Sequence, residues 1–134
     1  MHKLFKKILL LCLAVVSISS CAANLPQGAS GSTTDTKTKS IMVDSSGSYE
    51  DCFKVKRGEV LNYKFNSSGP LDFNVHYHGS NDVIYPVLQN DITAHEGTID
   101  PEQHGSEEEY YCLMWKNPGA QQCRISYKCD VIPK

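Results

Sequence analysis

Helical patterns and membrane-length apolar runs are both missing from this 134-residue sequence. No stretch repeats apolar residues at a spacing near 3.6, which excludes an architecture built from amphipathic helices. The most apolar segment, residues 8–18, holds about a dozen residues, whereas a helix that spans a bilayer needs roughly twenty. The segment is therefore too short to be a transmembrane helix.

The sequence signatures of common catalytic sites are missing as well. There is no Gly-rich phosphate loop, no Gly-x-Ser-x-Gly and no His-Glu-x-x-His. His95-Glu96 is an isolated dyad, for which a surface pair is the simpler interpretation. Cys112 would need a nearby histidine to act as a nucleophile, and cysteines of exported proteins are usually disulfide-bonded. We therefore expect a protein that is not an enzyme.

The N-terminus has the features of an export signal, with lysines in residues 1–7, an apolar segment and then small residues. Ile18-Ser19-Ser20-Cys21 resembles the lipobox of bacterial lipoproteins. This resemblance implies that residues 1–20 are a lipoprotein signal peptide and that Cys21 is acylated. Cys21 would anchor the exported protein in the bacterial envelope. Because Ala22 and not aspartate follows, the expected location is the outer membrane, facing the periplasm.

Basic residues are scarce once the signal peptide is removed. Cleavage before Cys21 removes three lysines and no acidic residue, which leaves 10 basic and 15 acidic side chains in 114 residues, a net charge of −5. Such a balance argues against nucleic acid as a partner. The expected partners are the membrane, through the lipid on Cys21, and a protein.

Residues 21–40 read as the lipidated cysteine followed by a flexible linker. The segment is rich in Ser, Thr, Gly and Ala and contains no aromatic residue. It cannot bury enough apolar surface to offset the entropy lost on ordering. We expect the folded domain to span residues 41–134, a length that fits a single domain.

Short apolar segments separated by turn signals fill the predicted domain. The expected strands cover residues 48–56, 60–66, 71–78, 83–88, 90–99, 109–115 and 121–131. No helical pattern lies between them, so the sequence predicts an all-β fold, an antiparallel β-sandwich of about seven strands.

The segment from Leu71 to His78 shows the clearest alternation in the chain. Its apolar side chains, Leu71, Phe73, Val75 and Tyr77, fall on one face and predict a core strand. His76 and His78 share the other face, which packing against the core does not explain.

Two histidines at i and i+2 on a strand can converge on one copper or zinc ion. The third ligand could be one of several residues: Asp72, Asn74, His95, His104, Cys112 or Met114. The alternative is a pair of solvated or hydrogen-bonded histidines with no metal. Because two ligands do not complete a site, we expect no cofactor as the first hypothesis and a copper or zinc ion as the alternative.

Four cysteines remain in the predicted domain: Cys52, Cys112, Cys123 and Cys129. An even number in an exported chain indicates disulfides. Cys123 and Cys129 lie on one expected strand, roughly 20 Å apart at about 3.3 Å per residue, which is too far for a bond between them. Cys112 with Cys123 and Cys52 with Cys112 both remain open.

Cys52-Phe53 and the segment Tyr111 to Asn117 resemble the GOLD domain of the p24 cargo-receptor family. That family is a β-sandwich with a Cys-Phe in an early strand and a Tyr-x-Phe-Cys-Phe-x-Asn pattern late in the chain, and its two cysteines bond. Here Met114 stands where the second cysteine belongs and Cys112 is two residues earlier on the same face. The resemblance favours a Cys52–Cys112 disulfide, and it implies binding of protein or lipid.

Three short patterns resemble a group of small exported bacterial proteins of unassigned function: His76-Tyr77-His78, Tyr85-Pro86-Val87 and Cys112-Leu113-Met114-Trp115. The sequence thus predicts a lipid-anchored, non-enzymatic binding module of the cell envelope. The alternative is a periplasmic copper or zinc protein that uses His76 and His78.

Overall fold

The computed structural model describes residues 35–134 of the chain. The expected signal peptide, the Cys21 anchor and the expected linker up to residue 34 lie outside the described residues. Within residues 35–134, no helix is long and apolar enough to cross a membrane.

Six strands and one short 3-10 helix make up the described domain. Their bounds are Asp35–Val43 (β1), Ser48–Lys56 (β2), Glu59–His78 (β3), Val83–Ile99 (β4), Pro101–His104 (η1), Glu108–Lys116 (β5) and Cys123–Pro133 (β6). All strand pairs are antiparallel. This confirms the predicted all-β, antiparallel fold.

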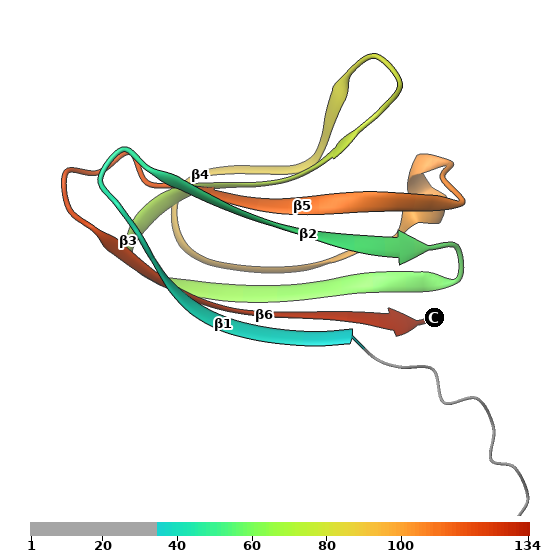
Figure 1. The fold of residues 1–134 in the computed structure, drawn as a ribbon, viewed down its shortest axis with the longest axis horizontal. Helices are drawn as coiled ribbons and strands as arrows, with labels where there is room; N and C mark the ends of the chain where they lie inside the picture. Colours follow the sequence, from blue (N-terminus) through green and yellow to red (C-terminus); the bar gives the residue numbers. More distant parts are fainter. Residues whose placement is uncertain (1–34) are drawn as a thin grey trace, which may run out of the picture. The chain divides into compact units, whose positions relative to one another are not determined.

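The long strand β3 belongs to two layers. Its first half, residues 59–67, pairs with β6, and residues 72–76 pair with β5. β1 extends the first of these layers, β2 extends the second, and β4 follows β3 through both. We call them the β6 layer and the β5 layer; Figure 1 shows them stacked on each other.

Residues 67–70 form a corner in β3 and not the expected turn between two strands. The register with β4 shifts between Asn66 and Leu71, and the Ser67 hydroxyl donates to the carbonyl of Gly69 at 2.7 Å. Pro70 has no N–H to give to a neighbouring strand. The chain therefore bends from one layer into the other without reversing. For this reason, and because residues 83–99 form one strand, the expected seven strands become five, and β1, which was not expected, makes six.

The core lies between the two layers, as the alternation predicts. Leu71, Phe73 and Val75 are fully buried and Tyr77 is 7% exposed, so the predicted core strand is confirmed. Trp115 of the β5 layer joins the layers, because its ring centroid lies 4.7 Å from that of Tyr127 in the β6 layer.

The domain begins earlier than the sequence predicts. Residues 35–40, which composition placed in the linker, form the first part of β1 and pair with residues 126–131 of β6. An edge strand of this kind is held by backbone hydrogen bonds, and its polar side chains Thr36, Thr38 and Ser40 remain exposed. The composition of residues 35–40 therefore did not predict the first part of β1.

Asn117 fastens the loop between β5 and β6 to the end of β1. This side chain is 2% exposed, and its amide nitrogen lies 3.2 Å from the carbonyl oxygen of Val43, 3.1 Å from that of Asp44 and 2.8 Å from that of Gln121. Buried polar groups persist only when they are hydrogen-bonded. Asn117 thus has a structural role within the segment that resembles the GOLD pattern.

Asp51 on β2 connects the open edges of the two layers. Lys37 of β1 places its Nζ 2.6 Å from Asp51 Oδ1, and the Tyr127 hydroxyl donates to Asp51 Oδ2. Burial alone would raise the pKa of the Asp51 carboxyl, but the hydrogen bonds from Lys37 and Tyr127 outweigh burial and lower it. The ionised carboxylate therefore stabilises the folded domain.

Candidate functional site

The outer face of the β5 layer carries the residues that the sequence singled out. Cys52, Cys112 and His76 stand side by side in one cross-strand row, because Cys52 pairs with Cys112 and Cys112 pairs with His76. Paired residues of an antiparallel sheet point to the same face. The next row along consists of Glu50, Met114 and Asn74.

Cys52 and Cys112 form a disulfide that links β2 to β5 across 60 residues of sequence, with their Cα atoms 4.0 Å apart. The predicted pair is confirmed, and the other open pair, Cys112 with Cys123, does not form. Cys123 and Cys129 are buried free thiols. Burial raises the pKa of the Cys129 thiol to about 12, so this sulfur remains protonated at neutral pH.

Each ring nitrogen of His76 lies close to a polar side-chain atom. Nδ1 lies 2.8 Å from Asn74 Oδ1, and Nε2 lies 2.9 Å from Oε1 of Glu50. His76 is only 6% exposed although it faces away from the core. The Tyr85 ring, 5.7 Å away between centroids, packs against it.

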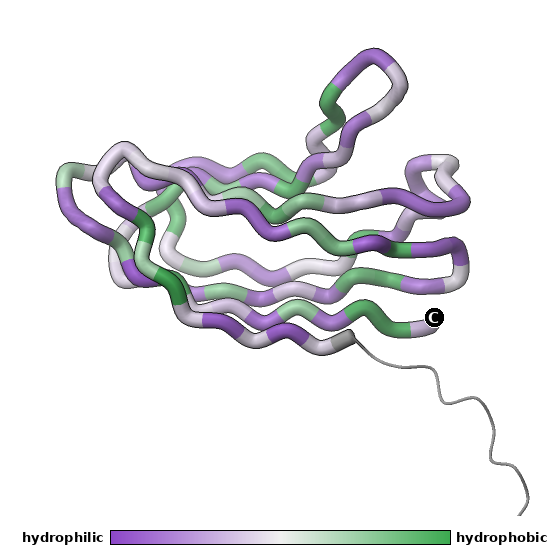
Figure 2. The backbone as a smooth tube through the Cα atoms, viewed as in Figure 1, coloured by the Kyte–Doolittle hydropathy of each residue, from purple (hydrophilic) through white to green (hydrophobic). Residues whose placement is uncertain are grey.

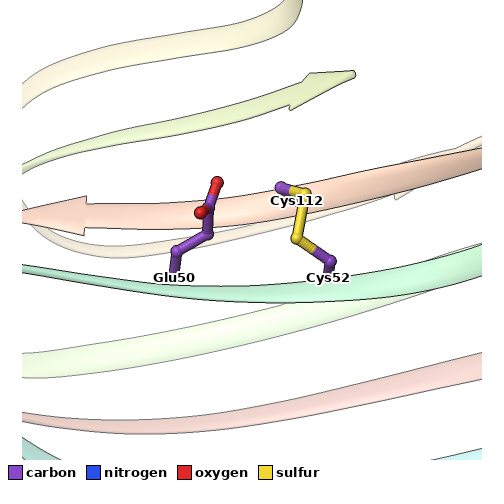
Figure 3. Close-up of side chains that lie close together, drawn as sticks. All are labelled: Glu50, Cys52 and Cys112. Atoms are coloured by element: carbon purple, nitrogen blue, oxygen red, sulfur yellow. A yellow bond between two sulfur atoms is a disulfide. The ribbon is translucent and has the colours of Figure 1, made fainter. Parts of the chain in front are cut away.

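Glu50 is the residue that sequence reasoning missed. It precedes Cys52 by two positions and shares its face, which is a signal that alternation could have provided. Figure 3 shows its carboxylate beside the disulfide. Its side chain is 45% exposed, so the contact with His76 lies at the solvent boundary.

The structure does not bring a metal-ligand set together around the two histidines. His78 is exposed, and its ring centroid lies 5.5 Å from that of His76. Among the described residues, the one group of three potential ligands within 4.8 Å of one another is Glu50, Cys52 and Cys112. The two sulfur atoms of this group are bonded to each other, so neither offers a thiolate.

The other residues considered as a third ligand have different contacts. His95 lies beside the Tyr63 hydroxyl, with Nδ1 at 3.2 Å, and His104 Nδ1 lies 2.9 Å from the Tyr111 hydroxyl. Asp72 accepts a hydrogen bond from the backbone N–H of Asp91. The copper or zinc hypothesis therefore stays a prediction, and a metal ion on Nε2 of His76 would replace its contact with Glu50.

The hairpin formed by β3 and β4 projects from the rest of the domain (Figure 1). Apolar side chains are exposed along its returning strand: Val83 and Ile84 are 40% exposed, Tyr85 52% and Leu88 61%. We call these four residues the hairpin patch. Figure 2 shows apolar residues on this projecting part of the chain.

Most of the hairpin patch lies on the same face as the histidines. Val83 pairs with His78 and Leu88 pairs with Asn74, so both point to the outer face of the β5 layer. Tyr85 also lies there, against His76. Ile84 pairs with Tyr77 and points to the opposite side. The outer face thus combines exposed apolar groups with the contacts of His76 to Glu50 and Asn74.

A cavity of about 380 Å³ lies elsewhere, on the β6 layer. Its lining includes three lysines, Lys39, Lys64 and Lys128. Each lysine already forms an ion pair with a carboxylate: Lys39 with Asp51 at 3.9 Å, Lys64 with Glu96 at 3.0 Å and Lys128 with Asp130 at 2.9 Å. These carboxylates therefore balance much of the positive charge that the lysines bring to the cavity.

No protein-family model and no curated protein matches this sequence. Among solved structures, the chain is similar to a mitogen derived from Yersinia pseudotuberculosis, with 13% identity and a TM-score of 0.49 over 75% of this chain and 86% of that chain. It is also similar to PliG of Aeromonas hydrophila, a periplasmic inhibitor of g-type lysozyme, with 14% identity and a TM-score of 0.49 over 79% and 92% of the two chains.

A de novo designed double-stranded β-helix is a further similar structure, with 16% identity and a TM-score of 0.35 over 72% of this chain and 99% of the design. At these identities and TM-scores, no activity or ligand transfers from these three proteins to the present chain.

Proposed function

We propose that this protein is a non-enzymatic, lipid-anchored binding module of the bacterial envelope, and that the hairpin patch contacts a protein partner. The hairpin patch carries the proposal. Of the six large apolar side chains that are exposed in the described residues, four lie within residues 83–88. Exposed apolar residues gathered in this way often mark an interaction surface.

The disulfide supports the expected location of the protein. Disulfides form and persist in oxidising compartments, including the bacterial periplasm. The Cys52–Cys112 bond therefore agrees with an exported protein. Acylation of Cys21 would add the anchor, with the domain facing the periplasm from the outer membrane. The resemblance to GOLD domains, which implies binding of protein or lipid, agrees with the same function.

Photocrosslinking in living cells tests the binding role. A photoreactive amino acid replaces Tyr85 or Leu88, and control variants carry it at the exposed positions Arg124 and Lys128 of β6. The expected result is a protein adduct of one discrete mass at both hairpin positions and at neither control position. Adducts at all four positions, or at none, would contradict a binding role for the hairpin patch.

Mass spectrometry of the N-terminal peptide tests the anchor. We expect a peptide that begins at Cys21 and carries acyl chains, and we expect Cys21→Ser to release the protein from the membrane fraction. Stable anchoring follows because each buried methylene contributes about 0.8 kcal/mol. A peptide that begins at another residue would exclude the lipid anchor and leave the binding role to be judged by the crosslinks.

A further inference from the structure

Charge is distributed unevenly along the chain, and the hairpin lies in its acidic part. Between Phe65 and Trp115 there is no lysine or arginine, whereas nine residues are aspartate or glutamate. This segment includes the second half of β3, all of β4 and most of β5. The positive charge that could balance this acidic segment must come from residues outside it.

Five of the nine acidic residues receive such a partner. Lys64 pairs with Glu96, Lys54 with Glu108, Arg57 with Glu107, and Lys134 with both Asp100 and Glu102. The other four take part in none of the ion pairs of the described residues: Glu109 on β5 and three residues of the hairpin, Asp72, Asp82 and Asp91. Three of the four carboxylates without an ion pair are therefore on the hairpin, where Asp72 lies opposite Lys116 of β5.

These three carboxylates border the hairpin patch. Asp72 is on the outer face with Asn74, the cross-strand partner of Leu88. Asp72 Oδ1 also lies 3.2 Å from the backbone nitrogen of Asp91, which places Asp91 next to it. Asp82 is at the tip of the hairpin, where its carbonyl accepts a hydrogen bond from the N–H of Gly79 at 2.8 Å. Negatively charged side chains thus border the apolar hairpin patch.

We propose that the partner presents a cationic surface to the hairpin, with lysine or arginine side chains around an apolar centre. This inference rests on the proposed function. A partner that covers Tyr85 and Leu88 would remove water from neighbouring carboxylates, and burying an unpaired charge is costly. Basic side chains on the partner would compensate that cost and would also steer the encounter.

Two other occupants fit less well. A second copy of this chain docked through the same patch would bring two sets of the same three carboxylates together, and like charges repel. A strand added to the free edge of β4 would meet Pro86, which has no N–H to donate, and proline on an edge strand discourages such pairing. A cationic side-chain surface remains the best match.

A pair of probes that differ in charge tests the proposal. Native cytochrome c is the cationic probe, and cytochrome c with succinylated lysines is its control. Each is titrated into the mature, isotopically labelled chain in neutral detergent micelles. We expect native cytochrome c alone to shift the amide resonances of residues 71–92, and we expect binding to weaken as the Debye length falls from about 30 Å at 0.01 M salt to 3 Å at 1 M.

Matched variants test the position of the charge. The triple variant Asp72→Asn, Asp82→Asn and Asp91→Asn removes three charges from the hairpin, and asparagine tolerates the positive φ of 57° at residue 91. Glu102→Gln, Glu107→Gln and Glu108→Gln remove as many charges from the ion-paired set. We expect about tenfold weaker binding in the first variant, because three exposed charge pairs at the rim of an interface together contribute about this much. We expect little change in the second variant.

Four outcomes would overturn the proposal: no binding of native cytochrome c, equal binding of the succinylated form, equal weakening in both triple variants, or a dimer of this chain that Leu88→Ser dissolves. Crosslinks at Tyr85 and Leu88 together with any of the first three outcomes would leave the binding role standing and remove only the cationic partner. The absence of hairpin crosslinks would contradict the binding role itself.

Discussion

His76 on β3 and Glu50 on β2 meet across β5, with Nε2 of the imidazole 2.9 Å from Oε1 of the carboxylate. The strand between them carries Cys112, so this contact and the disulfide connect the same three strands at one place. One histidine of the pair singled out by the sequence therefore has a structural role, whereas His78 remains exposed.

Replacing His76 by alanine should destabilise the domain. The change removes the contact with Glu50 and the hydrogen bond with Asn74, and an unsatisfied buried group costs about 1–3 kcal/mol. The free energy of unfolding in urea measures this cost. His78→Ala is the matched control, and we expect it to change the free energy by less than about 0.5 kcal/mol because the side chain is exposed. Equal effects of the two substitutions would show that the hydrogen bonds of His76 do not contribute.

Reduction of the disulfide should lower stability by more than either histidine substitution. In the chain-entropy treatment, a disulfide that closes a loop of 60 residues stabilises the folded state by about 4 kcal/mol. This value is an upper figure for the present site. Unfolding in urea with and without a reductant measures the difference. In a Cys52→Ser, Cys112→Ser variant the reductant should have no further effect, and a remaining effect would mean that another pair of cysteines is bonded.

Elemental analysis of protein purified without added metal distinguishes the two functional hypotheses of the sequence. We expect less than one equivalent of copper or zinc, because in the described residues no group of three close ligands includes His76 or His78. Stoichiometric metal that a His76→Ala, His78→Ala double variant loses would establish the alternative, a metal-binding protein. Metal that the double variant retains would have to be bound elsewhere.

Asn117→Asp should be costly although the two side chains have the same shape. The amide nitrogen of Asn117 faces three backbone carbonyls, and an aspartate would direct an oxygen acceptor at them from a buried position. We expect a loss of about 3 kcal/mol or more at neutral pH and a smaller loss under acidic conditions, where the carboxyl is protonated. Equal losses at both pH values would contradict this explanation.

Stability should fall in acid through Asp51. Because the pKa of its carboxyl in the folded domain is below the ordinary value of 3.8, ionised Asp51 stabilises the fold above about pH 4. This contribution is lost as the pH falls through the folded-state pKa. Urea unfolding between about pH 6 and about pH 3 should show a weaker pH dependence in Asp51→Asn than in the unaltered protein. Parallel pH profiles would exclude Asp51 as a source of the acid sensitivity.

Sequence patterns predicted the fold where side-chain alternation determines it. Leu71 to Tyr77 alternate without interruption, and the structure buries all four apolar members. The start of β1 could not be predicted in the same way, because residues 35–40 are held by backbone pairing with β6, which depends on no particular side chain. The corner at residues 67–70 has the composition of a turn, and only the pairing of β3 with β5 and β6 shows that the strand continues.

The candidate site was predicted in part. Alternation placed His76 and His78 on the outer face, and the resemblance to GOLD domains favoured the correct disulfide. The contact between His76 and Glu50 depends on the register of three strands distant in sequence, which periodicity within one strand does not contain. The exposure of Leu88 and Tyr85 also depends on how far the hairpin projects beyond the neighbouring strands.

The pairing of β1 with β6 bears on the order in which the domain folds. In the described domain, β1 pairs with β6 alone. During synthesis β1 emerges first and β6 last, so β1 has no partner strand until β6 has emerged. Because residues 35–40 are polar, this segment remains soluble until β6 is available for pairing. We expect the sandwich to close as the last step of biogenesis, after the complete chain has left the ribosome or export channel.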